Sequence, residues 1–312
     1  MTMYNSERKL RFIEEKESRT IVSKGFLKRK FELSSVYEEE KGKDLCQFTA
    51  YEIMDMYRGM NIYSHNSIIV MHSVYTQYVN WCIANNLVDD AQNHFMEIRS
   101  NTLGDYLNYV VAKKRIVSKA QVYEWCDELP NASDAFIILC LFEGIKGKEY
   151  SYIVNAKISD FDLESCEIRV PDGNVYSVSA KLVDSANESN STLTYFPISG
   201  SGKKEIQLRE NGLIIKDFGQ TNLTTSDAAR RRMTFRLARI LNYLGIQDWM
   251  SAHAFTDAGR INYIIERSSK LNISPKEFVL NADYFAELQK RYGVQSSLTR
   301  NLFYEKYKEY LS

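Results

Sequence analysis

The stretch Trp249-Met-Ser-Ala-His253-Ala-Phe-Thr256-Asp-Ala-Gly-Arg260 follows a segment that is rich in arginine, with Arg230, Arg231, Arg232, Arg236 and Arg239. Apolar residues recur at helical spacing over residues 227–244, so this segment is predicted to be a helix. A basic helix that leads into a histidine and a further arginine suits the binding of phosphate groups. We therefore take a phosphate-binding surface as the first hypothesis for this part of the chain.

The predicted arginine helix has one apolar face and one basic edge. At 100° per residue, an apolar stripe within about 40° is formed by Met233, Leu237, Ile240 and Leu244. A second group, about 110° away, consists of Arg232, Arg236, Arg239 and Tyr243. No acidic residue occurs between Asp227 and Asp248, whereas an ordinary solvated face mixes the two signs. The pattern favours an exposed phosphate-binding edge over a plain solvated face.

The 312 residues carry no net charge, but the charge is unevenly distributed. Residues 201–312 have a net charge of +6, and residues 46–200 have one of −8, so a basic surface is compatible with a neutral chain. No apolar run is long enough to span a bilayer, and we expect a cytoplasmic, nucleoid-associated protein of a bacterial host. Because the histidines and cysteines are scattered, we expect no metal site and no cofactor. The cysteines are expected to be reduced, and they are Cys46, Cys82, Cys126, Cys140 and Cys166.

Three regions are predicted along the chain. Residues 1–45 read as a charged helical arm that is either solvated, or contacts DNA or the next domain through Lys28-Arg-Lys30. Residues 46–128 read as a helical DNA-binding domain, with a capping box from Thr49 to Glu52 and an end near Pro130. Residues 129–312 read as a larger domain. Its strands are expected at 167–170, 175–178 and 195–198, and a loop at 184–192.

Further basic and polar residues are candidate DNA contacts. Tyr63-Ser-His-Asn-Ser67 precedes a predicted helix, where an N-terminus favours phosphate, although plain capping is the alternative. Lys113-Lys-Arg115 and Lys119 flank another predicted helix, and solvated surface is the alternative there. The residues that we expect to contact DNA are Ser64, His65, Asn66, Lys113, Lys114, Arg115, Lys119, Lys146, Lys148, Arg231, Arg232, Arg236, Arg239, His253 and Arg260.

Three motifs, taken in order, resemble the tyrosine recombinases (phage integrases). Gly144-Ile-Lys-Gly-Lys-Glu149 is similar to the family's first box, Gly-Leu-Arg-x-x-Glu, and Asp160-Phe-Asp162 follows it at a suitable distance. The arginine helix with His253 is similar to the second box, His-x-x-Arg. The resemblance covers residues 46–312. It implies a mainly α fold with a small antiparallel β-sheet, in which a helical core-binding (SAM-like) domain and a catalytic-like domain clamp duplex DNA.

This sequence departs from the family at the positions that serve catalysis. Family members cut DNA with a tyrosine while arginines, a lysine and a histidine stabilise the phosphate. Lys146 stands at the first arginine, Thr256 at the second, and the hairpin 171–174 has no lysine, although Lys181 follows. Losing one such contact costs roughly 3–4 kcal/mol, so we expect no enzyme and no catalytic residue, the degenerate positions being Lys146, His253, Thr256 and Tyr304.

The expected function is sequence-specific DNA binding by a transcriptional regulator. The chain resembles the recombinase-fold master repressors of SPβ-type Bacillus prophages, which implies a prophage repressor that maintains lysogeny. The implied partners are double-stranded DNA at phage operator sites and a protein antirepressor, with no membrane and a monomer or weak oligomer. One alternative is an active recombinase with displaced residues, in which Tyr304 acts with Lys146 and Arg260. A second is a phage accessory protein that binds proteins and not DNA.

Overall fold

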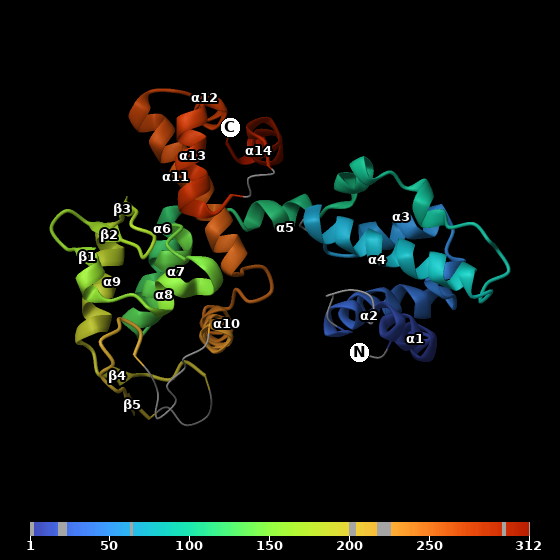
Figure 1. Cartoon of the computed structure of the whole chain (residues 1–312), viewed down its shortest axis with the longest axis horizontal. Helices are drawn as coiled ribbons and strands as arrows, with labels where there is room; N and C mark the ends of the chain where they lie inside the picture. Colours follow the sequence, from blue (N-terminus) through green and yellow to red (C-terminus); the bar gives the residue numbers. More distant parts are fainter. Residues whose placement is uncertain are drawn as a thin grey trace. The chain divides into compact units, whose positions relative to one another are not determined.

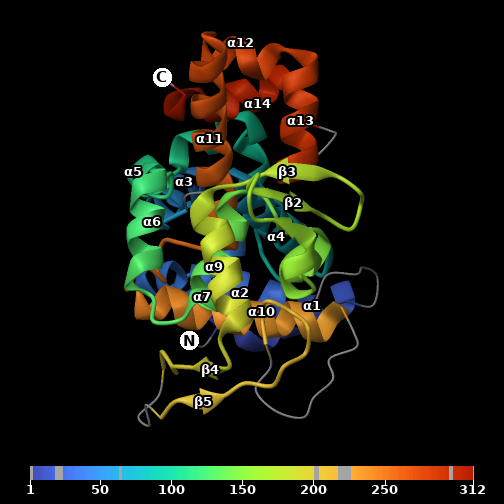
Figure 2. The same cartoon turned by 90° about the vertical axis from the view of Figure 1, so that its left-hand side faces the viewer.

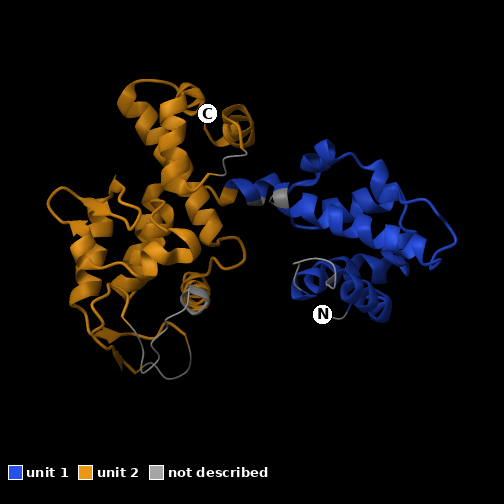
Figure 3. Ribbon diagram, viewed as in Figure 1, with its two compact units in different colours: residues 1–113 blue, residues 114–312 orange. Residues whose placement is uncertain are grey.

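The computed structural model of the chain describes residues 3–17, 24–62, 65–199, 204–216, 226–294 and 298–311. They form two compact units, Met1–Lys113 and Lys114–Ser312, which are coloured separately in Figure 3. Helices predominate in both units, and the described strands pair in small antiparallel sheets (Figure 1). The predicted fold class is therefore confirmed. None of the described helices combines the length and the apolar character that crossing a bilayer requires.

The first unit is built from helices around an aromatic core. The helices are α1 (Ser6–Glu17), α2 (Lys24–Lys41), α3 (Ala50–Gly59), α4 (His65–Ala84) and α5 (Tyr109–Lys114), with short 3-10 turns at Leu45–Gln47, His94–Glu97 and Ser100–Tyr106. The capping box predicted at the start of α3 is present, since the side chains of Thr49 and Glu52 each accept a backbone N–H of the other residue. Phe12, Phe31 and Tyr78 pack edge to face at its centre.

The N-terminal helices are part of this core, and a separate arm over residues 1–45 is not observed. Phe12, Leu27 and Phe31 are buried, and the ion pair between Lys9 and Glu38 joins α1 to α2 with both side chains fully buried. Three of the arm's apolar residues are thus used in the core, whereas Phe26 stays exposed, and two of its charges are paired inside. The second predicted boundary also differs, because the units divide at Lys113 and not near Pro130.

The second unit combines helices with two small antiparallel sheets. Its helices are α6 (Lys119–Glu128), α7 (Ala132–Phe142), α8 (Ser151–Val154), α9 (Ala180–Ser191), α10 (Ser226–Tyr243), α11 (Ala252–Leu271), α12 (Pro275–Leu280), α13 (Ala282–Tyr292) and α14 (Arg300–Tyr307), with 3-10 turns at Lys148–Tyr150, Ile158–Asp160 and Lys308–Tyr310. Helix α7 is buried on all sides and packs against α6, α9 and α11 (Figure 2). The second half of α11 packs with α12, α13 and α14 in a core cluster of its own.

The sheets follow the prediction in part. β1 (Phe161–Asp162), β2 (Glu167–Arg169) and β3 (Val175–Ser177) form one antiparallel sheet, in which Ile168 is paired with Phe161 and Tyr176. The expected third strand is instead β4 (Thr194–Tyr195), which pairs with β5 (Ile206–Gln207) in a separate sheet. The loop expected at 184–192 is wrong: it is helical in α9, because Ser179 caps the helix and Leu182 and Ala186 bury one face of it.

The crossing of α7 and α11 requires a glycine. A Cβ atom built on Gly259 would lie 1.6 Å from the carbonyl oxygen of Phe142, which is far inside van der Waals contact. Glycine in a helix interior is intrinsically unfavourable compared with alanine, so its place in α11 is explained by this close approach. The contact sets the position of α11, which carries His253 and Arg260, against the buried helix α7.

Candidate nucleic-acid interface

The arginines of α10 divide between the interior and the surface. As predicted, Met233, Leu237 and Ile240 are buried. Arg236 is also buried, with 8% of its surface exposed, so the prediction that it lies on an exposed edge is wrong, while its contact with DNA stays a prediction. Its Nε donates to Oδ1 of Asp134 at 2.7 Å, and a second nitrogen donates to the hydroxyl of Ser133. Because Ser133 and Asp134 lie in the first turn of α7, these contacts connect α10 to the start of α7.

The exposed side of α10 carries basic residues around an aromatic one. Arg231 and Arg239 are exposed, one turn before and one turn after Phe235, and 67% of the Phe235 side chain is accessible. These three residues, which we call the α10 outer face, lie within about 80° on the helical wheel. Arg232 is half-buried, and burial lowers its pKa, as does the charge of Arg236. Sequence reasoning missed Phe235, although its spacing to both arginines was visible.

Helix α11 begins beside the position where the family's second arginine would lie. Ser251 caps the helix by accepting the backbone N–H of Ala254 at 3.2 Å. Thr256 is buried and its hydroxyl donates to the carbonyl of Ala252 at 3.0 Å, so it is turned into its own helix. His253 is exposed on the side of the helix that Arg260 also occupies. Position 256 therefore offers no charge to a phosphate, as the sequence predicts.

Arg260 instead reaches the C-terminal helix α14. Its Nη1 donates to the hydroxyl of Tyr307 at 3.0 Å and lies 3.3 Å from Oδ1 of Asp257. The Tyr307 hydroxyl in turn donates to the same Asp257 oxygen at 3.3 Å, which closes a three-membered network. Burial raises the pKa of Tyr307, and the charge of Asp257 raises it further. A phenol in this environment is held in its protonated form.

Further basic groups surround this network. Burial lowers the pKa of Lys146, and the charge of Arg260 lowers it further. Partial desolvation by the surrounding groups likewise lowers the pKa of Lys306 and of His253, although both side chains are exposed in part, and the charge of Asp257 acts in the opposite direction in both cases. We call these residues the Arg260 cluster, and its members are Lys146, His253, Asp257, Arg260, Lys306 and Tyr307. The structure thus brings together Lys146, His253 and Arg260, which the sequence singled out separately.

The tyrosine in this cluster is not the one that the sequence favoured. Tyr304 is half-buried, and the ammonium group of Lys276 lies 5.6 Å from the centre of its ring. Tyr307, three residues later, provides the hydroxyl that meets Arg260. Asp257 and Lys306 were missed as well. Asp257 could have been found from its spacing, because it follows His253 by four residues and precedes Arg260 by three, so that all three share one side of a helix.

The hairpin position of the family's catalytic set contains no basic group, and the lysine that follows it is engaged elsewhere. The turn between β2 and β3 places Asp172 where a lysine is expected, and its carboxylate accepts the hydroxyl of Tyr152 at 2.9 Å. Lys181, the nearest later lysine, is bound to Asp127 and lies over the ring of Tyr123. Both side chains are therefore engaged in local contacts.

The remaining predicted contacts have different surroundings. Lys119 is bound to Glu266 at 3.0 Å. Arg115 donates to the Ser251 hydroxyl at 2.9 Å, and Lys114 lies 4.6 Å from the centre of the Trp249 ring. His65, Lys113 and Lys148 are exposed, and Lys114 is exposed as well. Ser64 and the side chain of Asn66 lie outside the described residues. No contact with DNA is tested at any of these positions, which stay predictions.

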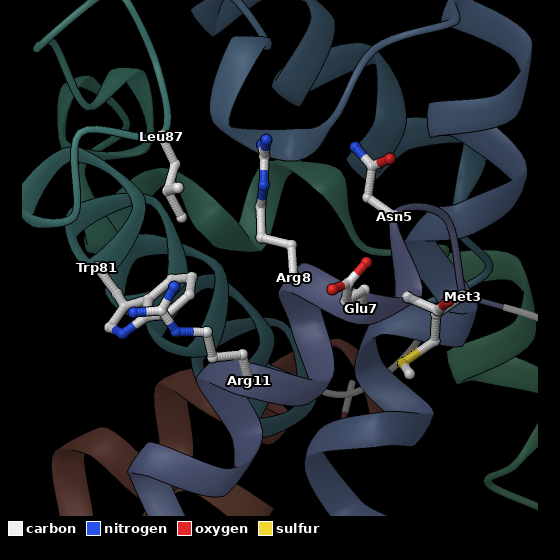
Figure 4. Close-up of a pocket in the computed structure, with 8 residues that line it drawn as sticks. Met3, Asn5, Glu7, Arg8, Arg11, Trp81 and Leu87 are labelled. Carbon is white, nitrogen blue, oxygen red and sulfur yellow. The ribbon is translucent and has the colours of Figure 1, made fainter.

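The first unit has a hollow of about 560 Å³ that is lined by arginines (Figure 4). Arg11 lies over the ring of Trp81 and is paired with Glu15 at 3.2 Å. Arg8 donates to the sulfur of Cys46 at 3.4 Å and is within electrostatic reach of the buried Asp44. Each guanidinium thus has a local acidic neighbour, so the hollow has no excess of positive charge. Among the described residues, no group of three or more His, Cys, Asp or Glu side chains is placed to hold a metal ion.

Comparisons with known proteins agree with the two-unit organisation. Residues 3–84 match the model of the MrpR N-terminal core-binding domain, and residues 116–311 match that of the MrpR C-terminal catalytic domain. The SPbeta prophage-derived uncharacterized protein YopR of Bacillus subtilis (strain 168) is 21% identical over 254 residues, which cover 78% of this chain and 76% of that protein. The crystal structure of XerA recombinase aligns over 99% of both chains, with 16% identity and a TM-score of 0.32.

Proposed function

The chain belongs to the MrpR family and has a recombinase fold of the SPbeta type, and from this premise we propose that it binds double-stranded DNA without cutting it. The observation that carries the proposal is the different use of its arginines. On the α10 outer face, Arg231 and Arg239 lie exposed around Phe235. In the Arg260 cluster, the guanidinium that would meet a phosphate is bound to Asp257.

In this proposal the outer face of α10 holds the DNA backbone. Guanidinium groups bind phosphate oxygens through paired N–H donors, and an exposed aromatic ring between them can pack on sugars or bases. Sequence preference would come from base contacts by other residues, for which His65 at the exposed start of α4 is a candidate. The role we propose is that of a prophage repressor that occupies operator sites and maintains lysogeny.

Replacing Arg231 or Arg239 by alanine is expected to weaken binding to all DNA sequences by similar factors. Each loss of a phosphate contact should reduce the slope of log affinity against log salt by about 1. Gel shifts of the full chain across salt concentrations measure this. Phe235→Ala removes no charge and should leave the slope unchanged. Lys270→Ala removes an exposed charge at the far end of α11 and is the control for a charge outside the proposed surface. Equal slopes for all four variants and the parent chain would contradict the proposed surface.

The lysogeny role has a separate test. Selection of bound fragments from prophage DNA should return a small set of promoter-proximal sites, and a reporter behind such a site should be silenced by the chain. If the chain binds all fragments equally, the proposal of DNA binding stands and the proposal of a repressor is excluded. Absence of binding to any DNA would favour the accessory protein that acts through protein partners.

An active recombinase is the second candidate, and the contact between Arg260 and Tyr307 is the observation in its favour. We expect no covalent adduct when the full chain is incubated with a nicked suicide substrate, because the Tyr307 phenol is buried and Arg260 is bound to Asp257. Denaturing gel electrophoresis detects such an adduct. An adduct that disappears in Tyr307→Phe but persists in Tyr304→Phe would overturn the non-cutting proposal and identify the nucleophile.

A further inference from the structure

The Arg260 cluster holds one carboxylate among several basic side chains. Asp257 lies on the same side of α11 as His253 and Arg260, and its charge also acts on Lys146 and Lys306. Its side chain is 33% exposed, whereas that of Arg260 is 10% exposed. A single carboxylate surrounded in this way lies where the positive charges of its neighbours add together.

The carboxylate satisfies the guanidinium only in part. Asp257 meets Arg260 through one pair of atoms, Oδ1 and Nη1. The Nε atom of Arg260 is buried and has no hydrogen-bond partner among the described residues. Buried N–H groups without an acceptor are rare and costly. A phosphate has enough oxygen atoms to accept from Nε and from the terminal nitrogen Nη2 on the same edge, which is one of the paired geometries of guanidinium with phosphate.

We infer that Asp257 stands in for a backbone phosphate at the Arg260 cluster. The resident carboxylate keeps phosphate oxyanions out of the cluster, because two anions beside one guanidinium repel each other. Removing the charge of Asp257 converts the cluster into a phosphate-binding site that uses Arg260 and Lys306, with Lys146 beside them. The nucleic-acid source of the phosphate rests on the proposed function, but the binding of the oxyanion itself does not.

Thermal unfolding of the full chain tests this inference with inorganic phosphate as the probe. The variants are Asp257→Asn and the matched control Asp283→Asn, which removes the same charge at an exposed position on α13. Each is melted in phosphate and in sodium chloride of equal ionic strength. At ten times its dissociation constant, phosphate should raise the melting temperature of Asp257→Asn by about 3–6 °C. The parent chain and Asp283→Asn should show only the general stabilisation that phosphate gives any folded protein, and the shift of about 3–6 °C is that of Asp257→Asn beyond theirs.

Further variants make the result specific to the cluster. Asp257→Glu keeps the charge and should stay insensitive to phosphate. Adding Arg260→Gln to Asp257→Asn should abolish the phosphate response. Where Asp257→Asn does not fold, Asp257→Ser replaces it, since its shorter side chain leaves room for the anion. The inference is overturned if phosphate raises the melting temperature of the parent chain as much as that of Asp257→Asn. It is also overturned if phosphate has no effect on Asp257→Asn.

A DNA measurement separates this inference from the proposed function. Asp257→Asn should bind duplex DNA more tightly than Asp283→Asn does, because one further phosphate gains a cationic partner. A phosphate response in the melting experiment without any binding of DNA by any variant would refute the proposed function and retain the phosphate stand-in. DNA binding by every variant without a phosphate response would refute the phosphate stand-in and leave the proposed function in place.

Discussion

Replacing Arg236 by alanine is expected to lower the free energy of unfolding of the second unit by about 3–5 kcal/mol. The side chain of Asp134 is fully buried, and Arg236 is its ion-pair partner at 2.7 Å. Removing the guanidinium leaves a buried carboxylate without its countercharge and also removes the donor to Ser133. The cost is large because the charge that remains cannot reach water.

Chemical unfolding of Arg236→Ala and Arg239→Ala measures this prediction. Arg239 is on the same helix and exposed, so its loss should change stability by less than about 0.5 kcal/mol while it weakens DNA binding. Asp134→Asn with Arg236→Gln removes both charges and should be less damaging than Arg236→Ala alone. A similar loss of stability for Arg236→Ala and Arg239→Ala would contradict the structural role of Arg236.

Replacing Gly259 by alanine is expected to destabilise the second unit by about 3 kcal/mol or more. The added methyl group would overlap the Phe142 carbonyl, and both groups belong to helix backbones that cannot yield separately. Relief requires α7 and α11 to move apart, which would also displace His253 and Arg260. We expect a lower melting temperature and, when the substitution is combined with Asp257→Asn, a smaller stabilisation by phosphate.

Gly25→Ala is the matched control for this substitution. Gly25 lies within α2, and a Cβ atom at this position would meet nothing within 4 Å. Alanine should therefore stabilise the helix there by about 0.5–1 kcal/mol. Differential scanning calorimetry of both variants gives the comparison. Equal stability of Gly259→Ala and the parent chain would show that the α7–α11 contact is looser than the geometry indicates.

Local patterns predicted much of the fold. The apolar stripe of Met233, Leu237 and Ile240 is buried, and the strands around the turn at 171–174 are formed. The helix α9 was missed because its apolar residues are few and its polar residues are typical of loops. Its identity depends on Leu182 and Ala186 packing inside the second unit, which no local pattern contains.

The candidate site was predicted less completely than the fold. The sequence placed Lys146 and His253 at positions of the family's catalytic set and named Arg260 as a catalytic group only in the alternative of an active recombinase, and the structure places the three together. It could not tell Tyr304 from Tyr307, because both lie at the correct distance from the C-terminus. The choice follows from how α14 packs on α11, which brings the Tyr307 hydroxyl to Arg260.

By itself, the sequence determined the helical character of the chain, the basic composition of α10 and the absence of an arginine at position 256. These properties depend on residue type and on spacing within one helix. The tertiary structure alone decided which charges face water. Arg236 is turned inward by Asp134, 102 residues away, and Arg260 is occupied by Asp257 and Tyr307. A helical wheel gives the direction of a side chain, but the partner that neutralises it is brought there by packing.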